Sequence, residues 1–231
     1  KLENGSWRTP YDPAESIHTV GDFCEGNGWQ YTFFVPHDPY GLIELFGGDK
    51  PFTKKLDEFF INNDSMGKLA SSDITGLIGQ YAHGNEPSHH AAYLYAYAGE
   101  QWKTAEKVRF IMDKFYTDKP DGIIGNEDCG QMSAWYIFSA MGLYQVNPSD
   151  GIFVFGSPCL DGIKINVRNG KTFTVEAVNN SKENIYIQKV FLNGKPYSKS
   201  YITYDDIMNG STLKFVMGKK PNKKFGEKPI D

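Results

Sequence analysis

The sequence predicts an α+β protein in which a helical part is followed by a β part. Through the first 147 residues, apolar side chains recur every three or four positions, which is the period of a helix packed on one face. From residue 151 onward, apolar and polar residues alternate, which is the period of a half-buried strand. A short turn-forming segment, 147–151, separates the two patterns. We therefore predict two domains, residues 1–147 and 148–231.

Four helices are predicted in the first domain. Ser88 is a good helix N-cap, Gly99 a stop for the same helix, and Gly142 a stop for the last one. The linker after residue 98 is short, so the second and third helices should form a hairpin. Repeated hairpins of this kind build helical toroids or solenoids. The predicted ranges are 51–61, 88–97, 102–115 and 131–141.

The second domain is predicted to be a small antiparallel β-sandwich. Strands are expected at 163–167, 173–177 and 212–217. Asn169-Gly170 and Asn193-Gly194 are strong hairpin turns, because both residue types tolerate positive φ. Few functional side chains gather in this region, so we expect it to be a packing or scaffold module.

Composition excludes several classes of function. A formal net charge of -4 and a pI near 5.8 argue against a nucleic-acid partner. No apolar run is long enough to span a membrane. Three widely spaced cysteines indicate neither a disulfide framework nor a zinc site. Because the sequence opens without an initiator methionine or a signal peptide, we expect a processed chain or a fragment of a longer one.

Three polar segments that contain glycine precede helix-like stretches: residues 24–31, 83–90 and 125–136. Loops at helix mouths present functional groups on a rigid scaffold, so the three segments are expected to share one pocket. A simpler interpretation is that their side chains only cap the helices that follow, and Asp128 would suit that role. The crowding of Glu, Asn and His in all three favours chemistry.

Two kinds of metal site match parts of the sequence. Glu86 with His89, and Glu15 with His18, have the Glu-x-x-His spacing of di-metal helical bundles. Pro87 argues against that site, because a proline pushes the preceding residue out of helical backbone angles. Oxygen-rich side chains of the 85–86 and 126–128 segments suit calcium better, although they do not form an EF-hand loop.

Paired carboxylates remain as the best chemical hypothesis, and they are typical of glycoside hydrolysis. One carboxylic acid protonates the leaving oxygen, and the other activates water or attacks directly. Glu25, Glu86 and Asp128 are the candidates. Trp29, next to Gln30 and close to Glu25, is the best-placed ring for stacking on a sugar.

At these residues the chain resembles glycoside hydrolase family 92, the calcium-dependent exo-acting α-mannosidases. The resemblance lies in residues 25–31 with 35–38 behind them, 83–90, and 125–136. It implies the last hairpins of an (α/α) toroid and an inverting mechanism, with Glu25 as general acid and Asp128 as general base. Some relatives have a second aspartate two residues before the base; here that position is Asn126, whose amide can hold the water but cannot accept its proton.

The resemblance also implies the binding residues. Calcium would bind the mannose O2 and O3 hydroxyls, with Asn85 and Glu86 at the sugar and metal site. The predicted substrate contacts are Trp29, Gln30, His83, Asn85, Glu86 and Glu127.

Further implications concern the whole protein. The expected substrate is a mannose-containing glycan, with an α-1,2 preference, in a secreted, periplasmic or cell-surface setting. The family's N-terminal region is absent from this chain, so the chain alone is expected to be inactive. The alternative function is a non-catalytic carbohydrate-binding or scaffold module.

Overall fold

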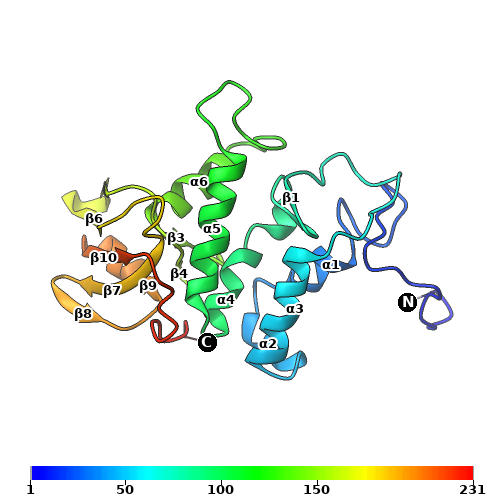
Figure 1. Ribbon diagram of the computed structural model, residues 1–231, viewed down its shortest axis with the longest axis horizontal. Helices are drawn as coiled ribbons and strands as arrows, with labels where there is room; N and C mark the ends of the chain where they lie inside the picture. Colours follow the sequence, from blue (N-terminus) through cyan, green and yellow to red (C-terminus); the bar gives the residue numbers. More distant parts are fainter. Residues whose placement is uncertain (1, 231) are drawn as a thin grey trace.

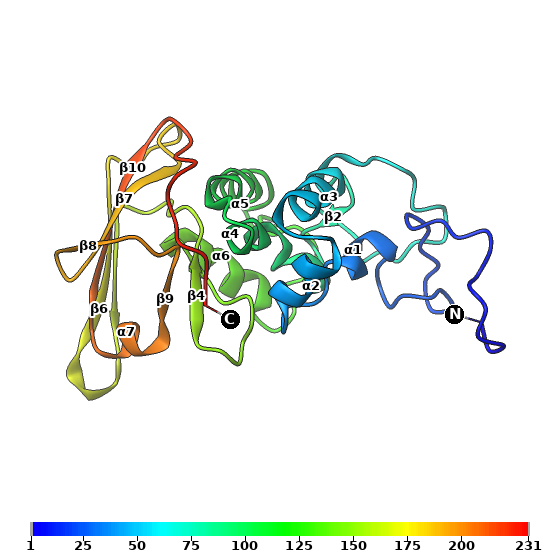
Figure 2. The same cartoon turned by 90° about the horizontal axis from the view of Figure 1, so that it is seen from below.

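The structure is a computed structural model in which residues 2–230 are described. It is an α+β protein, with helices in the first part and strands in the second (Figure 1). In both views the long N-terminal segment and the five-stranded sheet lie at opposite ends of the molecule, with the helices between them (Figures 1 and 2). The helices are α1 Gly28–Thr32, α2 Pro39–Leu45, α3 Asp49–Ile61, α4 Leu94–Tyr97, α5 Gln101–Phe115, α6 Gln131–Met141 and α7 Tyr204–Met208.

Three of the four predicted helices form as α3, α5 and α6. Helix α6 has the predicted bounds and ends at Gly142, whose φ of 84° is the left-handed conformation that stops many helices. A Cβ at this position would lie 2.8 Å from the ring of Pro158, so only glycine fits there. The helix therefore ends where both backbone conformation and space require it.

The predicted helix at 88–97 is wrong. The segment forms two 3₁₀ turns, η1 Glu86–Ser88 and η2 Ala91–Tyr93, and then the short α4. The hydroxyl of Ser88 accepts a hydrogen bond from the Ala82 amide (3.3 Å) and therefore does not cap a helix. Residues 88–98 are all buried, so tertiary packing decides the local conformation here.

The β part contains two sheets. A five-stranded sheet has the order β5-β6-β10-β7-β8, and a three-stranded sheet has the order β3-β4-β9. The turns at Asn169-Gly170 and Asn193-Gly194 connect antiparallel neighbours, as predicted. The strands are β3 Leu143–Tyr144, β4 Ile152–Phe155, β5 Gly162–Asn166, β6 Thr172–Val178, β7 Tyr186–Leu192, β8 Lys195–Tyr197, β9 Tyr201–Thr203 and β10 Thr212–Gly218; a further pair, β1 Leu77–Ile78 and β2 Tyr81–Ala82, lies among the helices.

One strand pair departs from the antiparallel prediction. Strand β10 runs parallel to β6 and antiparallel to β7. The helix α7 and the turn at Asn209-Gly210 come between β9 and β10, so this Asn-Gly pair ends a helix and does not close a hairpin. A local turn signal cannot specify which strand lies beside β10, because that pairing is non-local.

The three-stranded sheet is a middle layer. Along β4, Ile152 and Val154 belong to the core beneath the helices, whereas Phe153 and Phe155 belong to the core between the two sheets. The ring of Phe155 meets that of Phe215 edge to face, with centroids 5.1 Å apart. Figure 2 shows β4 and β9 between the helices and the strands of the larger sheet. Both faces of β4 are therefore buried.

One buried guanidinium also joins helix α5 to the β part. Arg109 donates from Nε to the Ser157 hydroxyl (3.0 Å) and from a terminal nitrogen to the side-chain oxygen of Asn180. Burial lowers the pKa of Arg109, which nevertheless stays charged because its ordinary value is so high. The predicted boundary at residue 147 falls between β3 and β4, which pair with each other across it.

The N-terminal segment, residues 2–27, follows the surface of the helical part without regular structure. The amides of Ser16 and His18 donate to the carbonyls of Met66 and Leu69 at 3.0 and 2.8 Å. Ala14 is fully buried and anchors the middle of the segment. Across residues 2–230, no helix has the length and apolar character needed to cross a membrane.

Candidate active site

The three polar segments meet, as the shared-pocket hypothesis requires. The side-chain amide of Asn85 donates to the backbone carbonyl of Glu25 (2.7 Å), which joins the first segment to the second. The second and third segments meet at glycines: a Cβ on Gly125 would lie 2.9 Å from the carbonyl oxygen of Gly84. Any side chain larger than that of glycine at position 125 would push the two backbones apart.

Glu25 lies on the last turn before helix α1, with an exposed side chain. Its φ is 48°, a left-handed conformation that non-glycine residues rarely adopt. Two residues later, Asn27 caps α1 by accepting from the amides of Trp29 and Gln30, both at 3.1 Å. Asn27 is fully buried and also donates to Gln80, which fixes this turn in the helical part. The turn thus presents Glu25 outward from a rigid base.

Asp128 lies in a similar strained turn before helix α6. Asp128, Cys129 and Gly130 have φ values of 49°, 58° and 95°. The N-cap is Gly130, and the amide of Ser133 in the first helical turn donates to the carboxylate of Glu127 (3.2 Å). The structure therefore assigns capping to Glu127 and leaves the Asp128 carboxylate on the surface. Asn126 is exposed in the same turn.

His83, predicted to contact substrate, lies in the core. It is fully buried, and both ring nitrogens are hydrogen-bonded, to the Tyr81 hydroxyl (2.8 Å) and the Tyr116 hydroxyl (2.7 Å). Tyr116 donates its own proton to the carbonyl of Met132, so Nε2 of His83 is the protonated nitrogen and Nδ1 accepts from Tyr81. Burial lowers the pKa of His83 well below its usual value, and the imidazole is neutral. We assign it a positioning role.

Gln30 and Trp29 are also interior residues. Gln30 accepts from the Asn27 amide and donates to the carbonyl of Gln80, so its side chain completes the cap of α1. Trp29 is 7% exposed, and the ammonium of Lys55 lies 3.8 Å from its ring centroid. Neither side chain presents a free face to a sugar. Their contacts support the turn that carries Glu25.

His89 joins the second segment to helix α6. Its Nε2 donates to the carbonyl of His83 (2.9 Å), its Nδ1 faces the amide of Gln131 (3.4 Å), and its own carbonyl accepts from the indole of Trp135 (3.1 Å). Burial lowers its pKa to about 4. With both nitrogens engaged and the ring neutral, His89 does not form the Glu-x-x-His metal pair with Glu86.

Glu86, which was predicted to contact both substrate and metal, lines a cavity. The cavity has a volume of about 390 Å³ and lies between η1, α6 and the loop after α1. Glu86 is partly exposed and is the first residue of the 3₁₀ turn η1. The prediction that Pro87 keeps Glu86 out of a helical turn is therefore wrong. Phe34, His90 and Gln131 are among the other lining residues. The cavity therefore combines a carboxylate, an amide and an aromatic wall.

Several residues that build the site carry no recognisable signal in the sequence. Tyr116 and Gln80 lie far from the polar segments in sequence, and only the folded chain brings them to His83 and Asn27. The third is Thr75, whose hydroxyl is buried beside Gly84 and Gly125. Within residues 2–230 this hydroxyl has no hydrogen-bond partner. No periodicity or motif marks these three positions.

Glu25 and Asp128 are thus exposed carboxylates on two turns. Paired carboxylates are typical of glycoside hydrolases. A family model described as "Glycosyl hydrolase family 92 catalytic domain" matches residues 1–219. The chain belongs to this family.

Known relatives agree with this assignment. The chain is 46% identical to the family GH92 α-mannosidase BT3965 from Bacteroides thetaiotaomicron, whose structure is in complex with mannoimidazole; the match covers 96% of this chain and 30% of that one, with a TM-score of 0.90. The inverting mannosidase BT2199 from the same organism is 38% identical, with 98% and 31% covered and a TM-score of 0.83. An uncharacterized secreted glycosidase from Arthroderma benhamiae is 34% identical over 94% of this chain and 27% of its own length. The chain therefore spans less than a third of these relatives.

The neutral buried histidines predict a pH dependence of stability. Burial lowers the pKa of His90 to about 4, and its Nε2 donates to the carbonyl of Phe33 (2.6 Å). Below pH 6.5 the unfolded chain binds a proton at this residue and the native chain does not, so the free energy of unfolding falls as the pH drops toward 4. We expect His90→Gln to reduce this loss by about 2 kcal/mol at pH 5, measured by urea unfolding at pH 7 and 5. The exposed His37→Gln is the control, and equal pH dependence in both variants would contradict the assignment.

The close approach of Gly84 to Thr75 predicts that substitutions at these two positions have non-additive effects on stability. A Cβ on Gly84 would lie 1.9 Å from the hydroxyl oxygen of Thr75. We expect Gly84→Ala to lower the free energy of unfolding by about 1–3 kcal/mol, through overpacking. Adding Thr75→Ala should restore part of the loss, since it removes the clashing oxygen. A double-mutant cycle by urea unfolding measures this. Gly162→Ala is the control, because a Cβ there would lie 3.6 Å from its nearest neighbour, the carbonyl oxygen of Val175. Additive effects would show that the two residues do not press on each other.

Proposed function

We propose that this chain is the catalytic-side part of an inverting α-mannosidase that removes terminal α-linked mannose from glycans. The observation that carries the proposal is the placement of Glu25 and Asp128. Both carboxylates are exposed on strained turns, and the two turns are joined through the Asn85 and Gly84 contacts. The mannosidase relatives support the same reaction.

In this mechanism Asp128 takes a proton from a water molecule as that water attacks the anomeric carbon. The bond between this carbon and the glycosidic oxygen breaks, and Glu25 gives its proton to the leaving oxygen. The new hydroxyl lies on the opposite face of the sugar, so the configuration inverts. Asn126 holds the water with its amide, and Glu127, Gln30 and His83 keep the two turns in place.

Calcium is the cofactor that we propose. Among residues 2–230 no three His, Cys, Asp or Glu side chains gather closely enough to form a metal site by themselves. Asn85 uses its amide nitrogen on Glu25, which leaves its carbonyl oxygen for a ligand, and Glu86 offers a partly exposed carboxylate. These are the hard oxygen donors that calcium prefers, and sugar hydroxyls and water suit the rest of its shell. A bound calcium ion would supply positive charge to the mannose O2 and O3 hydroxyls.

The finer points of the function concern the whole protein. We propose that the chain acts as part of a longer polypeptide whose N-terminal region completes the toroid and the substrate site, and that the fragment alone is inactive. An α-1,2 preference and a secreted or cell-surface location remain part of the proposal. The secreted relative from Arthroderma benhamiae is consistent with that location.

The acid–base assignment predicts the effect of two isosteric changes. In the full-length protein, Glu25→Gln and Asp128→Asn should each lower kcat for release of mannose by about 10²-fold or more, because the proton donor or acceptor is lost. Glu127→Gln, which keeps a capping oxygen, should have a much smaller effect. Quantifying free mannose released from an α-mannobioside provides the measurement. Glycan binding without turnover in the wild-type protein would instead support the non-catalytic alternative.

The calcium proposal predicts that activity is lost when calcium is chelated. Treating the full-length protein with EDTA should abolish most mannose release, and added calcium chloride should restore it while magnesium chloride should not, since magnesium demands a smaller octahedral shell. Glu86→Gln should raise the calcium concentration needed for half-maximal restoration. Unchanged activity after exhaustive chelation would exclude the metal from the reaction.

A further inference from the structure

The segment after strand β10 connects the β part to the first helices. It leaves β10 as an irregular stretch of chain, and both views show it running along the boundary between the strands and the helices (Figures 1 and 2). We call residues 225–230, the part that makes the crossing, the C-terminal strap. The family match ends at residue 219, so the strap lies beyond it.

One end of the strap is fixed to the β part. The amide of Glu227 donates to the carbonyl of Ser198 (2.9 Å), and the carbonyl of Glu227 accepts from the Ser200 amide (2.9 Å) and hydroxyl (2.8 Å). Phe225 packs against the core between the two sheets. Gly226 has a φ of 100°, and a Cβ there would lie 3.0 Å from that of Ser200. Only glycine lets the strap pass this close to the β part.

The other end of the strap is bound to helices α2 and α3. The Nζ of Lys228 lies 2.5 Å from a carboxylate oxygen of Asp49, the first residue of α3. The hydroxyl of Tyr40, in α2, donates to the carbonyl of Pro229, and Pro229 is buried. The strap therefore holds both helices of this pair.

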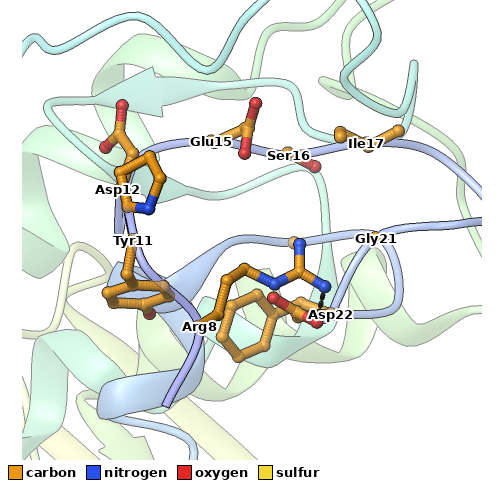
Figure 3. Close-up of a pocket in the computed structure, with 11 residues that line it drawn as sticks. Arg8, Tyr11, Asp12, Glu15, Ser16, Ile17, Gly21 and Asp22 are labelled. Atoms are coloured by element: carbon orange, nitrogen blue, oxygen red, sulfur yellow. Dashed lines mark hydrogen bonds and ion pairs between the residues drawn. The ribbon is translucent and has the colours of Figure 1, made fainter. Parts of the chain in front are cut away.

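The ion pair of the strap is unusual in what it connects. Lys228 and Asp49 are 179 residues apart in the sequence, whereas the pair Arg8–Asp22, drawn in Figure 3, joins residues 14 apart within one irregular segment. The side chains of both pairs are about half exposed, so neither pair adds much to the free energy of unfolding. We therefore look for the effect of the strap in the arrangement of the parts that it joins.

Helices α2 and α3 support the turn that carries Glu25. Helix α1 follows that turn, and Phe33 at its end packs against α3, with ring centroids 6.0 Å from Phe52 and 4.9 Å from Phe59. A change in the position of α3 therefore moves the base of the Glu25 turn.

Helix α3 has two contacts that fix its direction. Asp57 pairs with Lys103 of α5 (2.7 Å), and Asp49 pairs with Lys228 of the strap about 12 Å further along the axis. A rod that is held at one point can pivot, and a second point prevents this. The strap supplies the second point.

Helix α6, which follows Asp128, is fixed to the β part instead. The carbonyl of Gly142, at the end of α6, accepts from the amide of Gly156, just after β4 (3.0 Å). The rings of Phe138 and Phe153 stack with centroids 6.1 Å apart. The two proposed catalytic carboxylates thus have different supports, and the strap joins one support to the other.

We infer that the C-terminal strap sets the spacing between Glu25 and Asp128. Lys228, Asp49 and Tyr40 are positioning residues, because they hold the supports of the two carboxylates and act through them. The effect on turnover rests on the proposed function. In an inverting glycosidase the spacing of the two carboxylates leaves room for the attacking water, and a misplacement of about 1 Å can cost about 10²-fold in rate.

The chain contains its own reporters of this spacing. Cys24 precedes Glu25, Cys129 follows Asp128, and both cysteines are exposed. Nitroxide labels are attached to these two cysteines in the full-length protein, after its other cysteines are replaced by serine. Dipolar EPR then measures the distribution of distances between the labels, and this readout needs no substrate. Turnover is measured separately on unlabelled protein.

The variant Tyr40→Phe/Lys228→Met removes the contacts of the strap with α2 and α3 and keeps those with the β part. Tyr204→Phe/Lys214→Met is the matched control. Tyr204 is 52% exposed on the β part, and Lys214 forms an ion pair of similar exposure within the larger sheet. Lys228→Arg is the conservative variant that keeps the ion pair. If the double strap variant does not fold, Tyr40→Phe alone makes the same comparison.

We expect the strap variant to broaden the distance distribution, to move its mean by about 1 Å and to lower kcat for an α-mannobioside by about tenfold or more. Lys228→Arg and the control should match the wild type. An unchanged distribution would overturn the inference, and so would equal broadening in the control or a broader distribution with unchanged kcat. A wild-type protein that releases no mannose would refute the proposed function, while the label distances would still decide whether the strap sets the spacing.

Discussion

The hydrogen bonds of His89 are the constraint on which the site depends. Through one neutral imidazole and one carbonyl, this residue joins the turn at His83, just after strand β2, to Gln131 and Trp135 of helix α6. An imidazolium would lose its acceptor nitrogen, so the arrangement requires a dry interior that keeps the ring uncharged. The aromatic residues that surround it supply that interior, and the turn before α6 is held relative to the Asn85 segment as a result.

Sequence period predicts the elements of this fold well where packing and local preference agree. Helices α3, α5 and α6 have both an apolar stripe and a suitable stop, and two Asn-Gly turns form hairpins. The 88–97 segment fails because it is buried on every side, and a fully buried segment has no polar face to reveal its period. The parallel pairing of β6 and β10 depends on contacts distant in sequence, which no local pattern encodes.

The candidate site shows the same division. The three polar segments do come together, through the Asn85 amide and the close approach of Gly84 and Gly125. The sequence could not separate residues that face solvent from those that hold the turns, because Glu127 and Asp128 are adjacent and chemically alike. Only the backbone shows that one bonds to the Ser133 amide while the other is exposed. The buried positions of Gln30 and His83 likewise follow from partners such as Gln80 and Tyr116.

Strand β4 has a consequence for how the molecule holds together. Its alternate side chains belong to two different cores, and Arg109 adds a second connection between helix α5 and the β part. Separating the halves at the composition boundary would expose Ile152 and Val154 on one side and leave the helical core open on the other. We therefore expect the two parts to unfold together in one cooperative transition, because neither keeps its core covered without the other.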